Sequence, residues 1–351
     1  MVYKLDKIFR TAVKYKASDI FIGTGSKPAL RINGDLIPID DHPVLTKKMA
    51  EDYLLEILTE SQKKTFEQTL DLDLSVDIED IARFRVNMFV QRKGISAAFR
   101  LIPENIISLD ELGMPPQLKR ITKLKKGLVI VTGPTGSGKS TTLAAILNEI
   151  NQNDKKHIIT IEDPIEFVHK NGKSIVQQRE VGVHTTSFQR ALKASLRENP
   201  DVILVGEMRD LETIQLAITA AETGQLVLTT LHTSGAANSI NRIIDAFPFE
   251  QQNQIRAQLS ESLEAVIWQT LMKTKDKKGR VAGLEIMFNN SAIANMIRKQ
   301  ATHQVNSVIE TSAKEGMQTM KKSVTDLFHA GLISEEVALE SIPKEFEAGK
   351  N

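Results

Sequence analysis

Hydrophobic and polar positions follow two different rhythms along the chain, and the first of them ends near residue 102. Apolar residues three or four positions apart predict one face of a helix at Leu5, Ile8, Phe9, Ala12 and Val13. Short apolar runs predict strands at 19–23, 29–33, 35–39, 83–91 and 95–102, with a helical pattern at 46–70. Together these elements predict a small α+β domain.

Turn residues are expected to join two pairs of these strands into hairpins. Asn33-Gly34 lies within the first pair, and Arg92-Lys93-Gly94 separates the second; Asn-Gly is a strong signal for a tight turn between antiparallel strands. Three prolines and a glycine then interrupt any periodicity in 103–116, which is typical of an interdomain linker. We therefore expect a domain at 1–102, a linker at 103–116 and a second domain at 117–351.

The second rhythm alternates apolar, strand-like runs with helical segments. The runs occupy 127–133, 157–163, 202–207 and 225–233, and such alternation predicts a mostly parallel sheet covered by helices on both faces. A further strand at 281–288 follows the sequence TKDKKG, which fits a solvated hairpin end, and amphipathic helices are expected from Ser291 onward. The second domain is therefore expected to be of the α/β class.

Composition and charge narrow the possible partners and locations. The length of 351 residues fits two domains, and 45 Lys and Arg against 44 Asp and Glu give no basic field that favours nucleic acid as a partner. No run approaches the ~18 to 20 apolar residues of a membrane span, and the start lacks a signal peptide's apolar block, so we expect a cytoplasmic protein. The absence of cysteine excludes disulfides, thiolate zinc sites and cysteine nucleophiles.

The sequence GPTGSGKST is the most specific chemical motif in the chain. It lies between a predicted strand and a predicted helix, which is the arrangement of a P-loop that binds ATP. Its glycines allow successive backbone N–H groups to turn toward phosphate oxygens. Lys139 is expected to reach the β- and γ-phosphates and Ser140 to hold Mg²⁺. The predicted nucleotide-binding residues are Gly133, Pro134, Thr135, Gly136, Ser137, Gly138, Lys139, Ser140 and Thr141.

A second motif is an apolar strand that delivers a carboxylate at its end. Glu207 follows the run Val202 to Val205, where a Walker B strand places an acid beside the metal, so we predict Glu207 as a catalytic acid and a ligand of Mg²⁺. The alternative is a solvated strand end. Asp201 precedes the strand and is expected to cap or pair structurally.

Two further elements end at the same predicted sheet edge. Glu162, Asp163 and Glu166 surround Pro164 after one strand, where they could orient water through Mg²⁺ or act as a general base. Asp163 could instead, or at the same time, cap a helix that begins with Pro164. His232 follows another apolar strand. A histidine in such a place is more often structural than functional.

These four elements, in this order, resemble the secretion-type ATPase superfamily and, within it, the type IV pilus retraction (twitching motility) ATPases. The likeness includes ASDIFIGTGSKPALRINGDL, LRENPDVILVGEMRDLETIQLAITAAETG and HTSGAANSINRIIDAFP. The resemblance implies a RecA-like P-loop domain preceded by a smaller PAS-like domain, and a homohexameric ring. It also implies an inner-membrane pilus platform protein as partner, with peripheral membrane association through that platform.

The same resemblance suggests roles for individual residues. Glu166 matches the acid of the Asp box, thought to activate water, Glu207 matches the Walker B acid, and His232 matches the His-box residue near the γ-phosphate. The family's purpose, ATP hydrolysis that powers pilus retraction, is the function that the resemblance implies for this chain.

Arginines of the N-terminal sheet also reach the nucleotide in this family. Arg83, Arg85 and Arg100 occupy the corresponding hairpin here, and strand alternation places Arg83 and Arg85 on one face. Arginine could clamp phosphate oxygens through two hydrogen bonds. The alternative for each of them is an exposed, charged strand face.

Three positions depart from the family's pattern. Phe21 replaces a histidine, Gln225 stands where TGH is common, and Ala294 replaces an arginine in the C-terminal helix tied to retraction. Phe21 and Gln225 carry none of the expected phosphate chemistry. Ala294 therefore bears on the coupling of hydrolysis to movement, the role that this helix has in the family.

Other functions fit parts of the pattern. Extension and secretion ATPases of the same superfamily share the motor chemistry, but they usually carry a four-cysteine zinc site, and this chain has no cysteine. A conjugation-type secretion ATPase matches less of the retraction pattern. A nucleotide-binding regulator without turnover would be expected to have lost catalytic residues, whereas Lys139, Ser140, Glu166 and Glu207 are all present.

Overall fold

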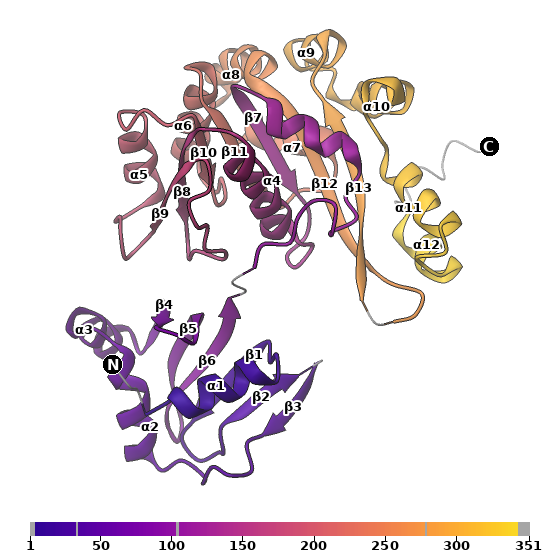
Figure 1. Cartoon of the computed structure of the whole chain (residues 1–351). Helices are drawn as coiled ribbons and strands as arrows, with labels where there is room; N and C mark the ends of the chain where they lie inside the picture. Colours follow the sequence, from indigo (N-terminus) through magenta and orange to yellow (C-terminus); the bar gives the residue numbers. More distant parts are fainter. Residues whose placement is uncertain (1–3, 33, 103–104, 278, 343–351) are drawn as a thin grey trace. The chain divides into compact units, whose positions relative to one another are not determined.

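The computed structural model describes residues 4–32, 34–102, 105–277 and 279–342 (Figure 1). The chain divides into two compact units. The first unit is Met1–Asn105 together with Pro164–Val168, and the second is Ile106–Asp163 together with His169–Asn351. The division after residue 105 falls inside the predicted linker, of which residues 103 and 104 lie outside the described residues.

The first unit contains a six-stranded antiparallel sheet of order β3-β2-β1-β6-β5-β4. Its strands are β1 (Asp19–Gly23), β2 (Ala29–Ile32), β3 (Asp35–Pro38), β4 (Asp71–Ile78), β5 (Ala82–Gln91) and β6 (Gly94–Ile102). Both predicted hairpins form, since Ile32 pairs with Asp35 and Gln91 with Gly94, although Asn33 itself lies outside the described residues. The sequence analysis missed β4, whose aspartates made DLDLSVDI read as polar, although its buried positions alternate with period two.

Helices cover one face of this sheet. They are α1 (Asp6–Lys14), α2 (Lys47–Leu54) and α3 (Glu60–Thr69), with a short 3₁₀ segment at Leu55–Ile57. The Phe9 ring of α1 stacks on Phe84 of β5 with centroids 4.6 Å apart, and Phe99 of β6 meets Phe9 edge-on at 5.3 Å. Val13, predicted on the apolar face of α1, is instead 37% exposed. Because Phe84 points into this core, its neighbours Arg83 and Arg85 point to the opposite face of the sheet.

The second unit contains a seven-stranded sheet of order β13-β12-β7-β11-β10-β8-β9. Its strands are β7 (Gly127–Thr132), β8 (His157–Glu162), β9 (Ile175–Glu180), β10 (Val202–Val205), β11 (Leu226–Leu231), β12 (Leu263–Lys273) and β13 (Arg280–Phe288). All neighbouring pairs are parallel except β12 with β13. The prediction of a mostly parallel sheet is therefore confirmed.

Two strands of this sheet escaped the sequence analysis. The strand β12 begins at Leu263, directly after the helix that ends at Ser262, so no Gly or Pro marks the change from helix to strand. The strand β9 has the partly polar sequence IVQQRE and lies at the edge of the sheet. The predicted hairpin end at TKDKKG does join two strands, with Lys273 paired to Arg280.

Helices accompany the second sheet, and the later ones lie beside the β12–β13 edge (Figure 1). The helices are α4 (Lys139–Asn153), α5 (Phe188–Ser195), α6 (Leu211–Glu222), α7 (Ala236–Asp245), α8 (Phe249–Ser262), α9 (Ser291–Arg298), α10 (Val305–Thr311), α11 (Met320–His329) and α12 (Glu335–Ser341). Short 3₁₀ segments occupy Pro116–Lys123, Thr302–Gln304 and Ala313–Glu315. Among the described residues, no helix is both long and apolar enough to cross a membrane.

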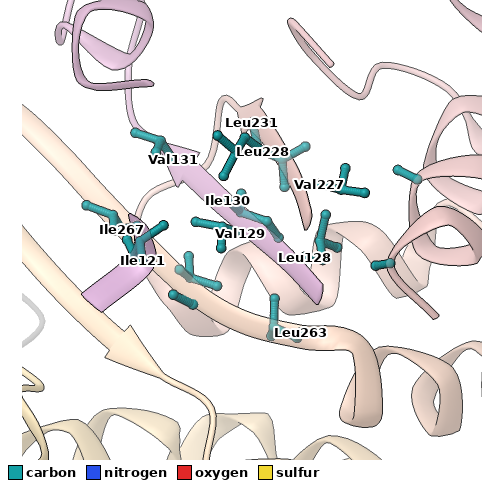
Figure 2. Close-up of a cluster of buried hydrophobic side chains, with 14 of the residues drawn as sticks. Ile121, Leu128, Val129, Ile130, Val131, Val227, Leu228, Leu231, Leu263 and Ile267 are labelled. Atoms are coloured by element: carbon teal, nitrogen blue, oxygen red, sulfur yellow. The ribbon is translucent and has the colours of Figure 1, made fainter. Parts of the chain in front are cut away.

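The strand β7, in the interior of the sheet, is enclosed by apolar side chains (Figure 2). Its residues Leu128, Val129, Ile130 and Val131 are 0% exposed and belong to one continuous core cluster. Burying each such aliphatic side chain contributes about 1.5–3 kcal/mol. The strand is therefore a firm base for the loop that follows Thr132.

Candidate functional site

The parallel register brings four strand ends to one edge of the second sheet. Thr132 at the end of β7 pairs with Leu231 of β11, and Val205 of β10 pairs with both Thr229 of β11 and Ile161 of β8. This carboxyl edge consequently brings together the loop after β7, His232 after β11, Glu207 after β10 and Glu162 of β8. Open α/β sheets bind ligands at such an edge.

The glycine-rich loop connects β7 to α4, as the sequence predicted. Gly136 has φ +78° and Gly138, the residue before α4, has φ +86°. Residues with a side chain rarely adopt these backbone angles. At Gly133 an added Cβ would lie 2.2 Å from the carbonyl oxygen of Gln269. The glycines therefore meet both a conformational and a spatial need, and they form the kind of backbone cradle that binds anions at a helix N-terminus.

Lys139 is held within this loop although it carries a charge. Its side chain is 8% exposed, and Nζ donates hydrogen bonds to the carbonyl oxygens of Gly133 at 2.9 Å and Pro134 at 3.0 Å. Ser140 and Thr141 are half-buried in the first turn of α4. The predicted loop residues thus form one continuous structure with a cation at its centre, suited to binding phosphate.

Glu207 and His232 come together at the same edge. The imidazole Nε2 of His232 lies 3.3 Å from Oε2 of Glu207, and Arg209 forms an ion pair with the other carboxylate oxygen. Partial burial lowers the pKa of His232, and the positive charges of Lys139 and Arg209 lower it further. His232 is therefore biased toward the neutral imidazole.

The acid-rich segment after β8 is irregular and does not form the predicted helix start. Glu162 accepts hydrogen bonds at Oε1 from Thr160 Oγ1 at 2.6 Å and from Gln178 Nε2 at 3.1 Å. No helix begins at Asp163, so the alternative that this residue caps a helix is wrong. Glu166 is exposed in the irregular segment Pro164–Val168 of the first unit, and its catalytic role stays a prediction.

The three predicted arginines lie on the face of the first sheet opposite its helices. Arg85 and Arg100 are direct cross-strand partners, an arrangement of like charges that is unfavourable by itself. Asp19 offsets it, because its Oδ1 accepts a hydrogen bond from Arg100 Nε at 2.9 Å. Arg83 donates from Nη2 to Ser75 Oγ at 2.8 Å. The shared face of Arg83 and Arg85 is confirmed, and the contact of these arginines with nucleotide stays a prediction.

Asp201 has the structural role that the sequence analysis favoured. Its Oδ2 accepts a hydrogen bond from the backbone N–H of His157 at 2.9 Å, and its Oδ1 lies 3.3 Å from Lys156 Nζ. Both contacts lie at the amino ends of the strands. Gln225 also precedes β11 at that end, away from the phosphate loop, so its departure from the family pattern leaves the loop untouched.

The other two departures are accommodated by packing. The guanidinium of Arg31 lies over the Phe21 ring, 5.2 Å from its centroid. Ala294 is 9% exposed on α9, and Ile297 on the same helix is fully buried. Arg298 donates from Nη1 to Ser260 Oγ at 3.0 Å, so α9 is fixed to α8 at this point.

Residues that the sequence analysis missed also shape the site. Gln269 of β12 hydrogen-bonds both Ser137 in the loop and Thr142 on α4. Arg209 could have been noticed because it follows Glu207 by two residues. Gln269 gave no such signal, since it belongs to no motif and lies far along the chain from the loop.

The chemistry of the donors at this edge fits a small hard cation. Ser140 offers a hydroxyl and Glu207 a carboxylate, the oxygen ligands that Mg²⁺ prefers. Within the described part of the chain, no group of three or more His, Asp or Glu side chains is arranged to hold a metal. A cation at this edge would therefore depend on water and ligand oxygens to complete its coordination.

Comparisons with known proteins agree with this geometry. The "Type II/IV secretion system protein" family model matches residues 1–339. The chain is 48% identical to the "Type IV pilus retractation ATPase PilT" of Pseudomonas aeruginosa, over 97% of this chain and 99% of that protein. It is 47% identical to a "Twitching motility protein" of Neisseria gonorrhoeae, over 96% of this chain and 90% of that protein.

A solved structure shows the same fold. The crystal structure of the pilus retraction motor PilT with bound ADP aligns with a TM-score of 0.92 and 43% identity, covering 100% of both chains. The predicted resemblance and fold class are therefore confirmed, and the likeness supports nucleotide binding and an ATPase of the secretion-system type. The chain belongs to the Type II/IV secretion system protein family.

Proposed function

We propose that this protein is a motor ATPase that hydrolyses ATP with Mg²⁺ to power type IV pilus retraction and twitching motility. The observation that carries the proposal is the carboxyl edge of the second sheet. There the glycine-rich loop encloses the Lys139 ammonium, and the Glu207–His232 pair follows strands whose parallel register ends at the same edge. Relatives that match this chain along nearly its whole length are named for pilus retraction and twitching motility.

In this proposal, some of the residues bind the nucleotide and others take part in the chemical step. The loop N–H groups and Lys139 bind the phosphates, and Ser140 and Glu207 would hold Mg²⁺, which supplies charge stabilisation on the transferring phosphoryl group. Glu166 would take the proton of the attacking water. His232, biased toward its neutral form, is suited to hydrogen bonding near the γ-phosphate without adding a full charge.

The arginines of the first unit would complete the site in a homohexamer. Arg83, Arg85 and Arg100 lie on a face free of helices, and guanidinium groups stabilise charge on a transferring phosphoryl group. Closure of the first unit on bound ATP, with the segment at 103–116 as hinge, would convert hydrolysis into motion. We propose that the motion is delivered to an inner-membrane pilus platform protein and that the chain is a cytoplasmic protein bound peripherally there.

Two experiments test this proposal at different levels. Purified protein should release phosphate from ATP with Mg²⁺ and stop when EDTA removes the metal. In cells, deletion of the gene should leave surface pili in place while abolishing their retraction, and restoring the intact gene should restore it. Loss of surface pili on deletion would instead indicate an extension motor, and retraction that persists would contradict the proposal.

A further inference from the structure

A buried amide on β12 joins the phosphate loop to the helix that follows it. Gln269 is 1% exposed; its Nε2 donates to the carbonyl oxygen of Ser137 at 2.6 Å, and its Oε1 accepts from Thr142 Oγ1 at 2.7 Å. The strand register places it there, because Trp268 pairs with Thr132, the last residue before the loop. A single side chain thus connects the middle of the loop with the first turn of α4.

The loop backbone also packs directly on this residue. An added Cβ at Gly133 would lie 2.2 Å from the carbonyl oxygen of Gln269, and one at Gly138 would lie 2.8 Å from its Nε2. Glycines at both ends of the loop therefore allow close approach to the same residue of β12. The loop is shaped from one side by its own φ angles and from the other side by Gln269.

The hydrogen-bonding pattern suits glutamine in particular. A carboxamide offers a donor at one end and an acceptor at the other, which matches the Ser137 carbonyl and the Thr142 hydroxyl. An ionised glutamate would place an acceptor oxygen against the Ser137 carbonyl, and leucine would leave both buried polar groups without this partner. Glutamine therefore satisfies both contacts with one uncharged side chain.

We propose that Gln269 is a positioning residue that holds the phosphate loop in its binding shape before nucleotide arrives. This inference rests on the proposed function insofar as the loop binds ATP. Without Gln269, bound ATP would have to order the loop itself, which weakens binding of the ground state and the transition state equally. Glu207 and His232 follow β10 and β11 and are not part of β12, so the chemical step is left intact.

The kinetic test compares Gln269→Leu with Ile267→Val, a control on the same strand whose fully buried side chain belongs to the apolar core. For Gln269→Leu we expect KM for ATP to rise about tenfold or more while kcat stays within about threefold. Gln269→Met, which offers no N–H or O–H donor, should behave alike, Thr142→Val should show a smaller rise, and Thr142→Ser should stay near wild type. Ile267→Val should leave KM unchanged. A folded Gln269→Leu protein whose KM is unchanged, whether or not its kcat is reduced, would overturn the proposal.

Hydrogen exchange separates this inference from the proposed function. In the full-length protein without nucleotide, amides of 133–142 should exchange faster in Gln269→Leu than in wild type or Ile267→Val. Faster exchange in a protein that binds no ATP would support the positioning role and contradict the proposed function. If Gln269→Leu fails to fold, Gln269→Met and Thr142→Val provide the same comparison; unchanged loop exchange in them would overturn the positioning role.

Discussion

Two groups of charged side chains in this protein are built in different ways. At the carboxyl edge of the second sheet, Lys139 and Glu207 follow buried strands and contact their own loop or a neighbouring strand end. In the first unit, Arg85 and Arg100 stand on a sheet face without helices, and the Arg100 side chain is 69% exposed. The first group is held by the loop backbone and the strand ends of one unit, whereas the second lies on an open sheet face, where Asp19 contacts Arg100 and Ser75 contacts Arg83.

This difference indicates which of the two groups of side chains could control catalysis. A loop whose shape is set by glycine φ angles and a buried strand is ready to bind before any ligand arrives. Exposed arginines gain strength only when a ligand desolvates them. A motor needs both kinds of group, because a catalytic site that is always complete would hydrolyse ATP without any dependence on domain motion. The predictions that follow test this division.

The largest effect is expected at the centre of the loop. Lys139→Ala removes the only charge held inside the loop by the Gly133 and Pro134 carbonyls, so ATP turnover should fall by about 10³-fold or more. Phosphate release under saturating Mg²⁺ and ATP measures the loss. Asp201→Asn, a substitution at the opposite edge of the sheet, serves as the matched control and should retain turnover. Equal rates for Lys139→Ala and wild type would remove the loop from the mechanism.

A smaller effect is expected in the first unit. Arg85→Ala should lower turnover by about 10- to 10²-fold with little change in nucleotide affinity, because in the proposed mechanism its charge would act on the transferring phosphoryl group. Arg85→Lys should recover only part of the rate, since a lysine cannot form the two-pronged contact. Arg92→Ala in the hairpin turn is the control. If Arg85→Ala hydrolysed ATP at the wild-type rate, the arginine face would be structural.

Low pH should lower the free energy of unfolding of the second unit, because it protonates a buried histidine near the acid-rich segment. Burial lowers the pKa of His169 to about 4 from its ordinary value of 6.5. Between these two values the unfolded chain binds a proton at this histidine and the folded chain does not. The stability is present above pH 6.5 and is lost as pH falls toward 4, by about 3 kcal/mol for this shift. Urea unfolding of wild type and His169→Gln at pH 7.5 and 5 should show the smaller pH dependence in the variant. Equal pH dependence in the two proteins would place the acid sensitivity elsewhere.

The smallest effect concerns a buried carboxyl behind the His box. Burial raises the pKa of Glu285, whose Oε1 accepts a hydrogen bond from the backbone N–H of Ala236 at the start of α7. A raised pKa means that the stability contributed by this carboxyl is full at low pH and is lost as pH rises through the folded pKa. Glu285→Gln keeps the acceptor and should stabilise the protein by about 1 kcal/mol at pH 8, and less at pH 5. Destabilisation at pH 8 would show that the ionised form is favoured.

Much of this architecture was readable from the sequence because local signals agreed with the fold. The strands β7, β8, β10 and β11 are continuous apolar runs, so their positions were predicted closely, and the carboxyl edge followed from parallel pairing. The motif GPTGSGKST identified the loop because its glycine spacing is a backbone requirement. The chemistry at the ends of strands was therefore the most predictable part of the site.

What escaped prediction depends on contacts between distant parts of the chain. Gln269 acquires its role only because β12 lies next to β7, and neither the existence of β12 nor that pairing is marked by local residues. The strand β4 was hidden by its solvent-facing aspartates. Residue pattern alone also gave no choice between the two forms of the segment at Asp163, since Asp-Pro suits both a helix start and an irregular turn.

The division between a binding loop and separate catalytic acids is tested most directly at Glu207. The measurement is of two quantities on one preparation of Glu207→Gln, the affinity for a fluorescent ATP analogue and the rate of ATP hydrolysis. The amide keeps the shape of the side chain and removes its charge, so turnover should fall by about 10²-fold or more while nucleotide affinity remains within about threefold of wild type. A proportional loss of affinity and turnover would contradict the division and make Glu207 part of the structure that binds nucleotide.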